Sequence, residues 1–220
     1  ICPHSAYAPK GKIVEPLGPA RPHHEISRKD FPVTYNKLTS LEICAGAGGQ
    51  ALGLETAGFT HKAVIEVDQW AAQTLRLNRG DSGPHGKWNV LEMDVHDFDG
   101  KPWRHKIDLF AGGVPCPPFS IAGKQLGADD DRDLFPEALR LIDEIDPPAV
   151  LLENVKGLGQ KRFADYRRNI IIKLEELGYQ VFWELLQAAD YGVPQLRPRF
   201  ILVALKKEFS EFFAWPNKIP

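Results

Sequence analysis

The sequence predicts an α/β fold: a doubly wound, mostly parallel sheet whose final strand is antiparallel. Short apolar runs typical of buried strands alternate along the chain with segments of helical periodicity. This alternation favours a parallel sheet with helices on both faces. Two closing strands, at about 179–186 and 199–205, are joined by a turn-rich stretch without a helical pattern. We therefore expect this last pair to be antiparallel.

The composition indicates a single hydrophobic core but does not by itself indicate whether the protein binds a polyanion. The chain has 220 residues, 43% of them hydrophobic, which suffices for one sizeable core. A net charge of −2 neither favours nor excludes a polyanionic partner. The cysteines, at positions 2, 44 and 116, are odd in number and far apart, which favours a reducing cytoplasm over a disulfide framework. Because no apolar run approaches the ~20 residues of a membrane span, no membrane partner is expected.

Residues 1–37 differ from the rest of the chain. They are rich in proline and lack apolar periodicity, so an extended arm or linker is predicted before a domain over residues 38–216. The pair His23-His24 has no further ligand at metal-binding spacing, and no metal site is predicted. Since the chain begins with Ile1 and no signal-peptide pattern, we expect a trimmed or partial chain.

Two strand–helix units open the domain. A strand over residues 41–44 leads through glycines into a helix over about 50–57, which Gly58 would end in the C′ position. A second strand, at 63–67, is followed by Asp68, a typical N-cap residue, and by a helix towards position 78.

The same alternation continues through the remaining elements. Strands are predicted at 90–93, 107–111 and 149–152, and helices at 134–145 and 163–177. In the first of these helices, apolar residues at positions 134, 138, 141, 142 and 145 share one face. Pro147-Pro148 would end it, because proline lacks the N–H that a helix requires.

The glycine turn after the first strand predicts a cofactor site. Gly46-Ala-Gly48-Gly49-Gln-Ala51 fits the pattern G-x-G-x-x-G/A between strand and helix, and Glu66 follows 20 residues after Gly46. This arrangement favours an adenosine-type cofactor over a turn that merely needs left-handed glycines. Asp94 adds a carboxylate after the third strand, and no Lys or Arg lies near the turn to neutralise a pyrophosphate. A cationic sulfonium cofactor therefore suits this crevice better than NAD.

The stiff Pro-Cys turn is the candidate catalytic element. Pro115 and Cys116 follow the strand at 107–111, at the sheet edge where open α/β folds bind ligands. Alone, the thiol is either a buried apolar group or a nucleophile. Glu153 follows the fifth strand, and Arg197 and Arg199 precede or begin the last strand, so a thiol, a carboxyl and guanidinium groups converge on this edge. A surface Arg–Glu pair beside a buried thiol is the alternative.

These motifs together resemble a known family. The glycine turn, Pro115-Cys116, Glu153-Asn154-Val155 and Gln195-x-Arg197-x-Arg199 match, in order and spacing, the DNA cytosine-C5 methyltransferases over about residues 38–216. The resemblance implies a Rossmann-like methyltransferase fold, S-adenosylmethionine as cofactor with S-adenosylhomocysteine as product, and duplex DNA as partner. It also implies a restriction-modification setting and methylation at carbon 5 of a flipped-out cytosine.

The resemblance also assigns roles to individual residues. Cys116 would attack C6 of the cytosine, and Glu153 would contact N3 and the exocyclic amine and supply a proton. Arg199 would hold O2 and Arg197 the site or a flanking phosphate, while Asn154 would fix the Pro115 turn. Ser120, Lys124 and Gln125, in a lid-like segment, and Gln195 would contact DNA.

The cofactor residues that the resemblance implies fall into three groups. Glu66 would bind the ribose hydroxyls and Asp94 the adenine amine, with Val67 and Val95 on the two faces of the adenine. The others line the methionine end or the turn: Cys44, Ala45, Gly46, Gly48, Gly49, Gly112 and Leu134.

Some positions depart from the family pattern. Glu42-Ile-Cys44 replaces the usual Asp-x-Phe, Gln50 stands where an aromatic residue is common, and Pro117 replaces a frequent Gln. Residues 217–220 would begin a target-recognition region that the chain lacks and that a second chain could carry. An RNA cytosine-C5 methyltransferase and a non-catalytic, cofactor- or partner-binding half of a split enzyme stay open as alternatives. A nicotinamide dehydrogenase fits the glycine turn but leaves the Pro-Cys and Gln-x-Arg-x-Arg segments unexplained.

Overall fold

The computed structural model describes residues 38–80, 87–115 and 133–219. The predicted arm at 1–37 and the predicted site residues Cys116, Ser120, Lys124 and Gln125 lie outside these ranges.

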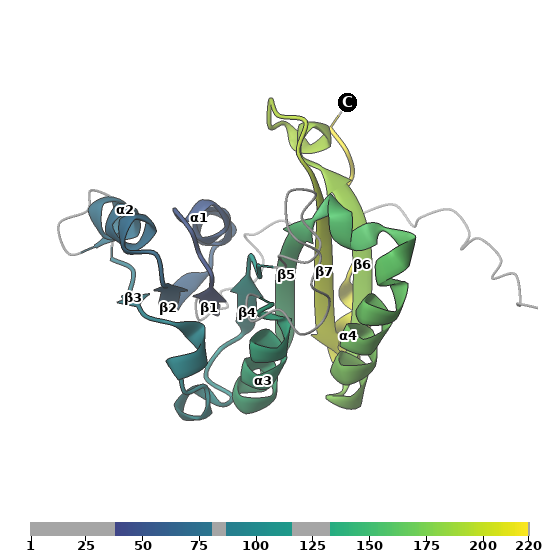
Figure 1. The fold of residues 1–220 in the computed structure, drawn as a ribbon, viewed down its shortest axis with the longest axis horizontal. Helices are drawn as coiled ribbons and strands as arrows, with labels where there is room; N and C mark the ends of the chain where they lie inside the picture. The colour runs from purple at the N-terminus through teal and green to yellow at the C-terminus, as the bar shows by residue number, and fades with distance from the viewer. Residues whose placement is uncertain (1–37, 81–86, 116–132, 220) are drawn as a thin grey trace, which may run out of the picture. The chain divides into compact units, whose positions relative to one another are not determined.

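The central feature is a seven-stranded sheet with the order β3-β2-β1-β4-β5-β7-β6 (Figure 1). Its strands are β1 (Thr39–Ile43), β2 (Thr60–Glu66), β3 (Val90–Glu92), β4 (Leu109–Gly112), β5 (Ala149–Val155), β6 (Tyr179–Gln187) and β7 (Pro198–Lys206). The first five strands pair in parallel, whereas β7 is antiparallel to both β5 and β6. The predicted doubly wound sheet with an antiparallel end is confirmed.

In the described ranges, four α-helices cover the sheet: α1 (Gly49–Thr56), α2 (Gln69–Arg79), α3 (Phe135–Ile145) and α4 (Ala164–Glu176). Alternate strand residues face opposite ways, so Leu41 and Ile43 of β1 pack in the same core as the buried residues of α3 and α4. Val64 of β2 faces the other way and packs with Leu75 of α2 and with Trp88. The helices thus divide between the two faces, as a parallel sheet requires.

The helix ends follow the predicted signals. Asp68 Oδ1 accepts hydrogen bonds from the backbone N–H groups of Trp70 and Ala71, at 2.9 and 2.8 Å, and so caps α2. Gly58, just after α1, has φ +101°, a left-handed conformation that glycine adopts without strain. At the end of α3, Asp146 takes the left-handed conformation with φ 50° before the two prolines.

The strand order reverses between β1 and β4, and this point positions the site. Ile43 pairs with Gly112, so the chain leaves two neighbouring parallel strands side by side, at Cys44 and Gly113. From β1 the chain goes to β2 on one side, and from β4 to β5 on the other. Ligands of open α/β sheets bind in the crevice that forms at such a reversal.

The antiparallel β5–β7 pair brings the predicted carboxyl and guanidinium groups to the same edge. Glu153 lies opposite Ile201 and Val155 opposite Arg199, so Glu153 and Arg199 are diagonal neighbours on one face of the sheet.

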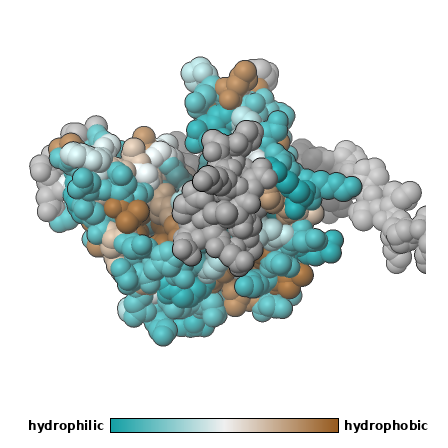
Figure 2. Space-filling view, viewed as in Figure 1, coloured by the Kyte–Doolittle hydropathy of each residue, from teal (hydrophilic) through white to brown (hydrophobic). Residues whose placement is uncertain are grey.

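The surface carries its apolar residues in separate places. Figure 2 shows hydrophobic atoms at the tip of the β6–β7 connection, where Val193 and Leu196 are exposed. Among the described helices, none is long and apolar enough to cross a membrane.

Replacing the α2 cap tests this account of the fold. We expect Asp68→Ala to lower the free energy of unfolding by about 1 kcal/mol, because two N–H groups of the first turn lose their acceptor. Asp68→Ser keeps an acceptor oxygen and serves as the matched control, with most of the stability retained. Urea titrations of the three proteins measure the effect, and equal losses in both variants would contradict the capping role.

Candidate active site

Two adjoining cavities lie at the carboxyl edge of the sheet. The larger has a volume of about 570 Å³ and is lined by Glu153, Arg197 and Arg199, among others; we call it the Glu153 cavity. The smaller, of about 360 Å³, is lined by Glu66 and Asp94 among others; we call it the Glu66 cavity. Both include Cys44 and Gly113, the two residues at which the chain leaves β1 and β4.

An ion pair organises the Glu153 cavity. Arg199 Nε lies 2.6 Å from Glu153 Oε1, and Arg197 Nη2 lies 3.8 Å from the same oxygen. All three side chains are part-exposed, at 29% for Glu153, 24% for Arg199 and 48% for Arg197. A carboxyl and two guanidinium groups are thus presented together to one cavity with solvent access.

Asn154 fastens the edge of the sheet to the start of the Pro-Cys turn. Its side chain is buried, and Nδ2 donates to the carbonyl of Val114 at 2.9 Å, while Oδ1 accepts from its neighbour Val155 at 2.8 Å. The N–H of Leu134 donates to the carbonyl of Pro115 at 3.4 Å. The described residues on either side of segment 116–132 are therefore tied to each other and to β5.

Glu66 organises the Glu66 cavity. Its carboxylate accepts from the backbone N–H groups of Gly46, at 2.6 Å, and of Asp68, at 2.9 Å, which holds the glycine turn against the start of α2. Each carboxylate oxygen can accept a second hydrogen bond, so Glu66 keeps capacity for a ligand hydroxyl.

Asp94 stands at another part of the same cavity. Its Oδ1 accepts from the backbone N–H of His96 at 3.0 Å and lies 2.6 Å from Nδ1 of the same residue. The hydrogen bonds to the backbone and side chain of His96 lower the pKa of Asp94, which is therefore ionised at neutral pH.

The lining of the Glu66 cavity fits an adenosine-bearing cation. Its apolar wall includes Ile65, Met93 and Leu134, and Val95 and the exposed Val67 also line it. A Cβ built on Gly46 would meet nothing within 4 Å, so the turn leaves open space beside Glu66. No Lys or Arg stands among its described lining residues, whereas two carboxylates do.

Nearby carboxylates also act on the thiol of Cys44, which lines both cavities. Burial, and then the charges of Glu66, Asp94 and Glu42, raise its pKa to about 12. Cys44 therefore stays protonated at neutral pH and is not a nucleophile.

The structure brings most, but not all, predicted site residues to the two cavities. The Glu66 cavity contains Cys44, Gly46, Glu66, Val67, Asp94, Val95, Pro115 and Leu134; the Glu153 cavity contains Cys44, Ala45, Gly49, Glu153, Arg197 and Arg199. Four predicted residues are not in the described lining of either: Gly48, Gly112, Asn154 and Gln195. Gly48 and Gly112 instead permit close packing, against Leu75 and against Ile43 respectively.

Sequence reasoning missed Glu42 as a cavity residue. It is fully buried, lines the Glu153 cavity with Gln50, and neither of its oxygens has a hydrogen-bond partner among the described residues. Burial raises the pKa of Glu42 to about 8; the nearby backbone N–H of Ala51, whose geometry falls short of a hydrogen bond, offsets part of this rise. The sequence did contain one indication of this role: a carboxylate in the middle of an apolar strand, where burial of an ionised group costs free energy.

Comparison with known proteins gives consistent matches. Residues 38–219 match the family described as C-5 cytosine-specific DNA methylase. The chain is 62% identical over 181 residues to the type II methyltransferase M.NgoMIV of Neisseria gonorrhoeae, covering 82% of this chain and 56% of that protein. It is 55% identical over 182 residues to M.NaeI of Lentzea aerocolonigenes, covering 82% and 43%. The chain thus spans about half the length of these relatives.

Solved structures share the fold. One from an E. coli prophage, described as a DNA modification methyltransferase, aligns with a TM-score of 0.66 at 28% identity, covering 79% of this chain and 48% of that one.

A series of Gly→Ala substitutions tests the glycine turn. Gly48 has φ +91°, and an added Cβ would lie 2.6 Å from Leu75 Cδ2, so Gly48→Ala should cost both backbone strain and repacking, about 2–4 kcal/mol of stability. Gly58→Ala, with φ +101° and open space, should cost only the strain, about 1–2 kcal/mol. Gly53→Ala, in open space on α1, should stabilise by about 0.5–1 kcal/mol. Denaturant unfolding measures the free energy of unfolding of each variant. A loss of stability in Gly48→Ala that is no larger than the loss in Gly58→Ala would refute the packing argument.

The buried Glu42 carboxyl predicts a pH dependence of stability. Its pKa is about 8 when folded against 4.5 as the ordinary value, so its contribution is complete below about pH 4.5 and is lost as pH rises towards 8. Relative to Glu42→Gln, the wild-type free energy of unfolding should fall by up to about 1.4 kcal/mol per pH unit between these values and level off above them. Urea unfolding from pH 5 to 9 measures the difference, with Glu175→Gln on the exposed side of α4 as control. A difference independent of pH would contradict the assignment.

Proposed function

Because the chain belongs to the C-5 cytosine-specific DNA methylase family, we propose that the complete protein methylates carbon 5 of cytosine in duplex DNA with S-adenosylmethionine. The observation that carries this proposal is the junction of two cavities at the strand-order reversal. One presents Glu153 with Arg197 and Arg199, and the other is acidic with an apolar wall. A base and a cofactor bound in the two cavities would meet beside Cys44 and Gly113.

The Glu153 cavity has the groups that a cytosine edge needs. Cytosine presents an acceptor at O2, an acceptor at N3 and a donor at its exocyclic amine. Arg199 would donate to O2, while Glu153, when protonated, would donate to N3 and accept from the amine. The ion pair between these two side chains keeps both oriented towards the cavity before the base arrives. A base inside a stacked duplex cannot enter such a cavity, so the cytosine would be flipped out, at a cost of a few kcal/mol.

The covalent step is assigned to Cys116, which lies outside the described residues. Its neighbour Pro115 lines the Glu66 cavity, which supports a thiol beside the cavity junction. The thiolate would form a C–S bond at C6, the C5–C6 π electrons would move into the ring, and Glu153 would give its proton to N3. As C5 takes the methyl group, N3 would return its proton to Glu153; loss of the C5 proton to a base would then re-form the C5–C6 double bond and break the C–S bond. The thiolate would be released unchanged.

The Glu66 cavity would hold the cofactor. Glu66 would accept from the ribose hydroxyls, Asp94 from the adenine amine, and Val67 and Val95 would contact the adenine faces. When bound, S-adenosylmethionine supplies an electrophilic methyl group on a sulfonium. The carboxylates of Glu66 and Asp94, which add to burial in raising the pKa of Cys44, also favour a positively charged sulfonium in this crevice.

DNA is favoured over RNA by the family that matches residues 38–219, which is described as a C-5 cytosine-specific DNA methylase. Gln195 and the segment with Ser120, Lys124 and Gln125 would contribute DNA contacts, and a further part of the complete protein, or a second chain, would select the target sequence. A cytoplasmic location fits this role. Residues 1–37 stay proposed as an arm and 217–220 as the start of the region that follows the catalytic domain.

Removal of the two reacting groups tests the function. In the complete gene product, Cys116→Ala should abolish transfer of radiolabelled methyl groups from S-adenosylmethionine to duplex DNA. Glu153→Gln should lower kcat by about 10²–10⁴-fold because the proton donor is lost. Glu175→Gln, exposed on α4, is the control and should keep wild-type activity.

The substrates in this assay separate the alternatives. Wild-type labelling of RNA with none of DNA would favour the RNA enzyme. No labelling of either by the complete wild-type protein, with intact cofactor binding, would favour the non-catalytic half. Full activity of Cys116→Ala would refute the nucleophile assignment.

A further inference from the structure

We propose that Arg140 is a positioning residue for the adenine end of the Glu66 cavity. It would act by holding the turn that carries Asp94, Val95 and His96. This inference rests on the proposed cofactor site and assigns its geometry to Arg140, a residue that does not itself line the cavity.

The turn in question has little support of its own. It is a single 3-10 turn, Val95–Asp97, closed by backbone hydrogen bonds from Asp97 to Asp94 at 3.1 Å and from Phe98 to Val95 at 3.2 Å. A 3-10 turn of this length has poorer hydrogen-bond geometry than an α-helix and does not define its own position. The placement of the cavity residues at its start must therefore come from neighbouring elements.

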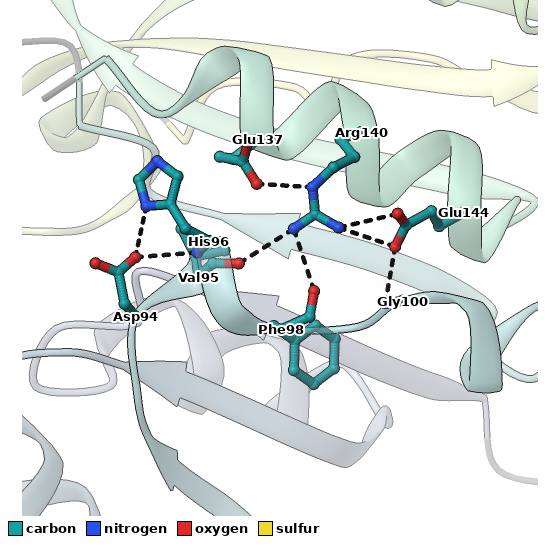
Figure 3. Close-up of polar contacts among 8 residues, drawn as sticks. All are labelled: Asp94, Val95, His96, Phe98, Gly100, Glu137, Arg140 and Glu144. Atoms are coloured by element: carbon teal, nitrogen blue, oxygen red, sulfur yellow. Dashed lines mark hydrogen bonds and ion pairs between the residues drawn. The ribbon is translucent and has the colours of Figure 1, made fainter. Parts of the chain in front are cut away.

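Arg140 provides this support from α3 (Figure 3). Nη2 donates to the carbonyls of Val95, at 3.3 Å, and Phe98, at 3.1 Å, which are the first residue of the turn and the residue that follows it. One planar group therefore bridges the beginning and the end of the turn.

Two carboxylates on α3 fix the orientation of the Arg140 guanidinium. Nε donates to Glu137 at 2.7 Å, and Nη1 donates to both oxygens of Glu144 at 3.0 Å. Glu137 and Glu144 lie one turn before and one turn after Arg140 on α3, so the helix holds all three in register. The Arg140 guanidinium is therefore already oriented towards the carbonyls of Val95 and Phe98.

The network extends to the next turn of the chain. Glu144 also accepts from the N–H of Gly100 at 2.9 Å, and a Cβ on Gly100 would lie 2.9 Å from Glu144 Oε2. The segment from Val95 to Gly100 is thereby fastened at three points to α3, and the buried side chains of Val95 and Phe98 anchor it in the main core.

The same helix already contributes to the cavity directly. Leu134, at the N-terminal end of α3, lines the Glu66 cavity together with Asp94, Val95 and His96. Arg140 therefore fixes the distance between two walls of one cavity: the wall that begins α3 and the wall on the 94–96 turn. A lysine at this position would keep the charge but, as a point donor, could not bridge two carbonyls and two carboxylates at once.

The test compares Arg140→Lys with a matched control in the complete protein. Arg104 also donates to backbone carbonyls on α3, those of Asp143 and Glu144, and among the described residues it forms no hydrogen bond or ion pair with the 95–98 turn. Arg104→Lys is therefore the control. For Arg140→Lys we expect the KM for S-adenosylmethionine to rise about 10-fold, with kcat at saturating cofactor and the KM for DNA little changed. A purely structural defect would instead lower kcat, through the folded fraction, and leave KM unchanged.

A second readout addresses the adenine directly. Calorimetric Kd values are measured for S-adenosylhomocysteine and for its analogue with hypoxanthine in place of adenine, which lacks the exocyclic amine. The wild-type protein and Arg104→Lys should prefer the adenine compound, because Asp94 accepts from its amine. In Arg140→Lys this preference should shrink several-fold.

The outcomes separate the two proposals. If the wild-type protein binds S-adenosylhomocysteine but Arg140→Lys keeps both the affinity and the adenine preference, the positioning role is overturned and the proposed cofactor site stands. If the wild-type protein binds neither compound, the cofactor site itself is wrong. A preference lost equally in Arg104→Lys would also overturn the specific role of Arg140.

Discussion

The parallel pairing of β1 with β4 is the constraint on which the rest of the site depends. Because these neighbouring strands point the same way and their connections run to opposite sides of the sheet, the chain opens a crevice at Cys44 and Gly113. Both cavities include these two residues. The antiparallel β5–β7 pair then adds Glu153 and Arg199 to the same edge, so that two chemically different cavities adjoin.

Charge divides this crevice into two halves. The Glu66 cavity carries carboxylates without a described Lys or Arg, while the Glu153 cavity carries two guanidinium groups beside the carboxyls of Glu153 and Glu42. The acidic Glu66 cavity suits a sulfonium. The Glu153 cavity, in which a carboxyl is paired with guanidinium groups, suits a nucleobase that has both hydrogen-bond donors and acceptors. The buried Glu42 adds a second carboxyl to the Glu153 cavity, and burial, which disfavours the charged form, raises its pKa to about 8.

Helix α3 ties the two halves together mechanically. Its N-cap residue Leu134 donates a hydrogen bond to the carbonyl of Pro115, at the edge of the Pro-Cys turn, and its middle carries Arg140, which holds the turn after β3. This helix therefore positions both Pro115, at the described end of the Pro-Cys turn, and the 94–96 wall of the Glu66 cavity. Placement of a site on such an element gives better-defined geometry than placement on loops alone.

The sequence by itself determined the order of strands and helices, the cap at Asp68, the left-handed Gly58 and the family, because local periodicity, capping chemistry and motif spacing are written along the chain. It also indicated that Glu153 and Arg199 share an edge, because the end of one strand and the start of a neighbouring antiparallel strand lie at the same edge of a sheet. Only the tertiary structure decided that Gly48 and Gly112 serve close packing, that Glu42 is buried in the cavity wall, and that Arg140 supports the 95–98 turn. These contacts join residues far apart in the sequence and depend on how the helices pack on the sheet. No local sequence pattern indicates them.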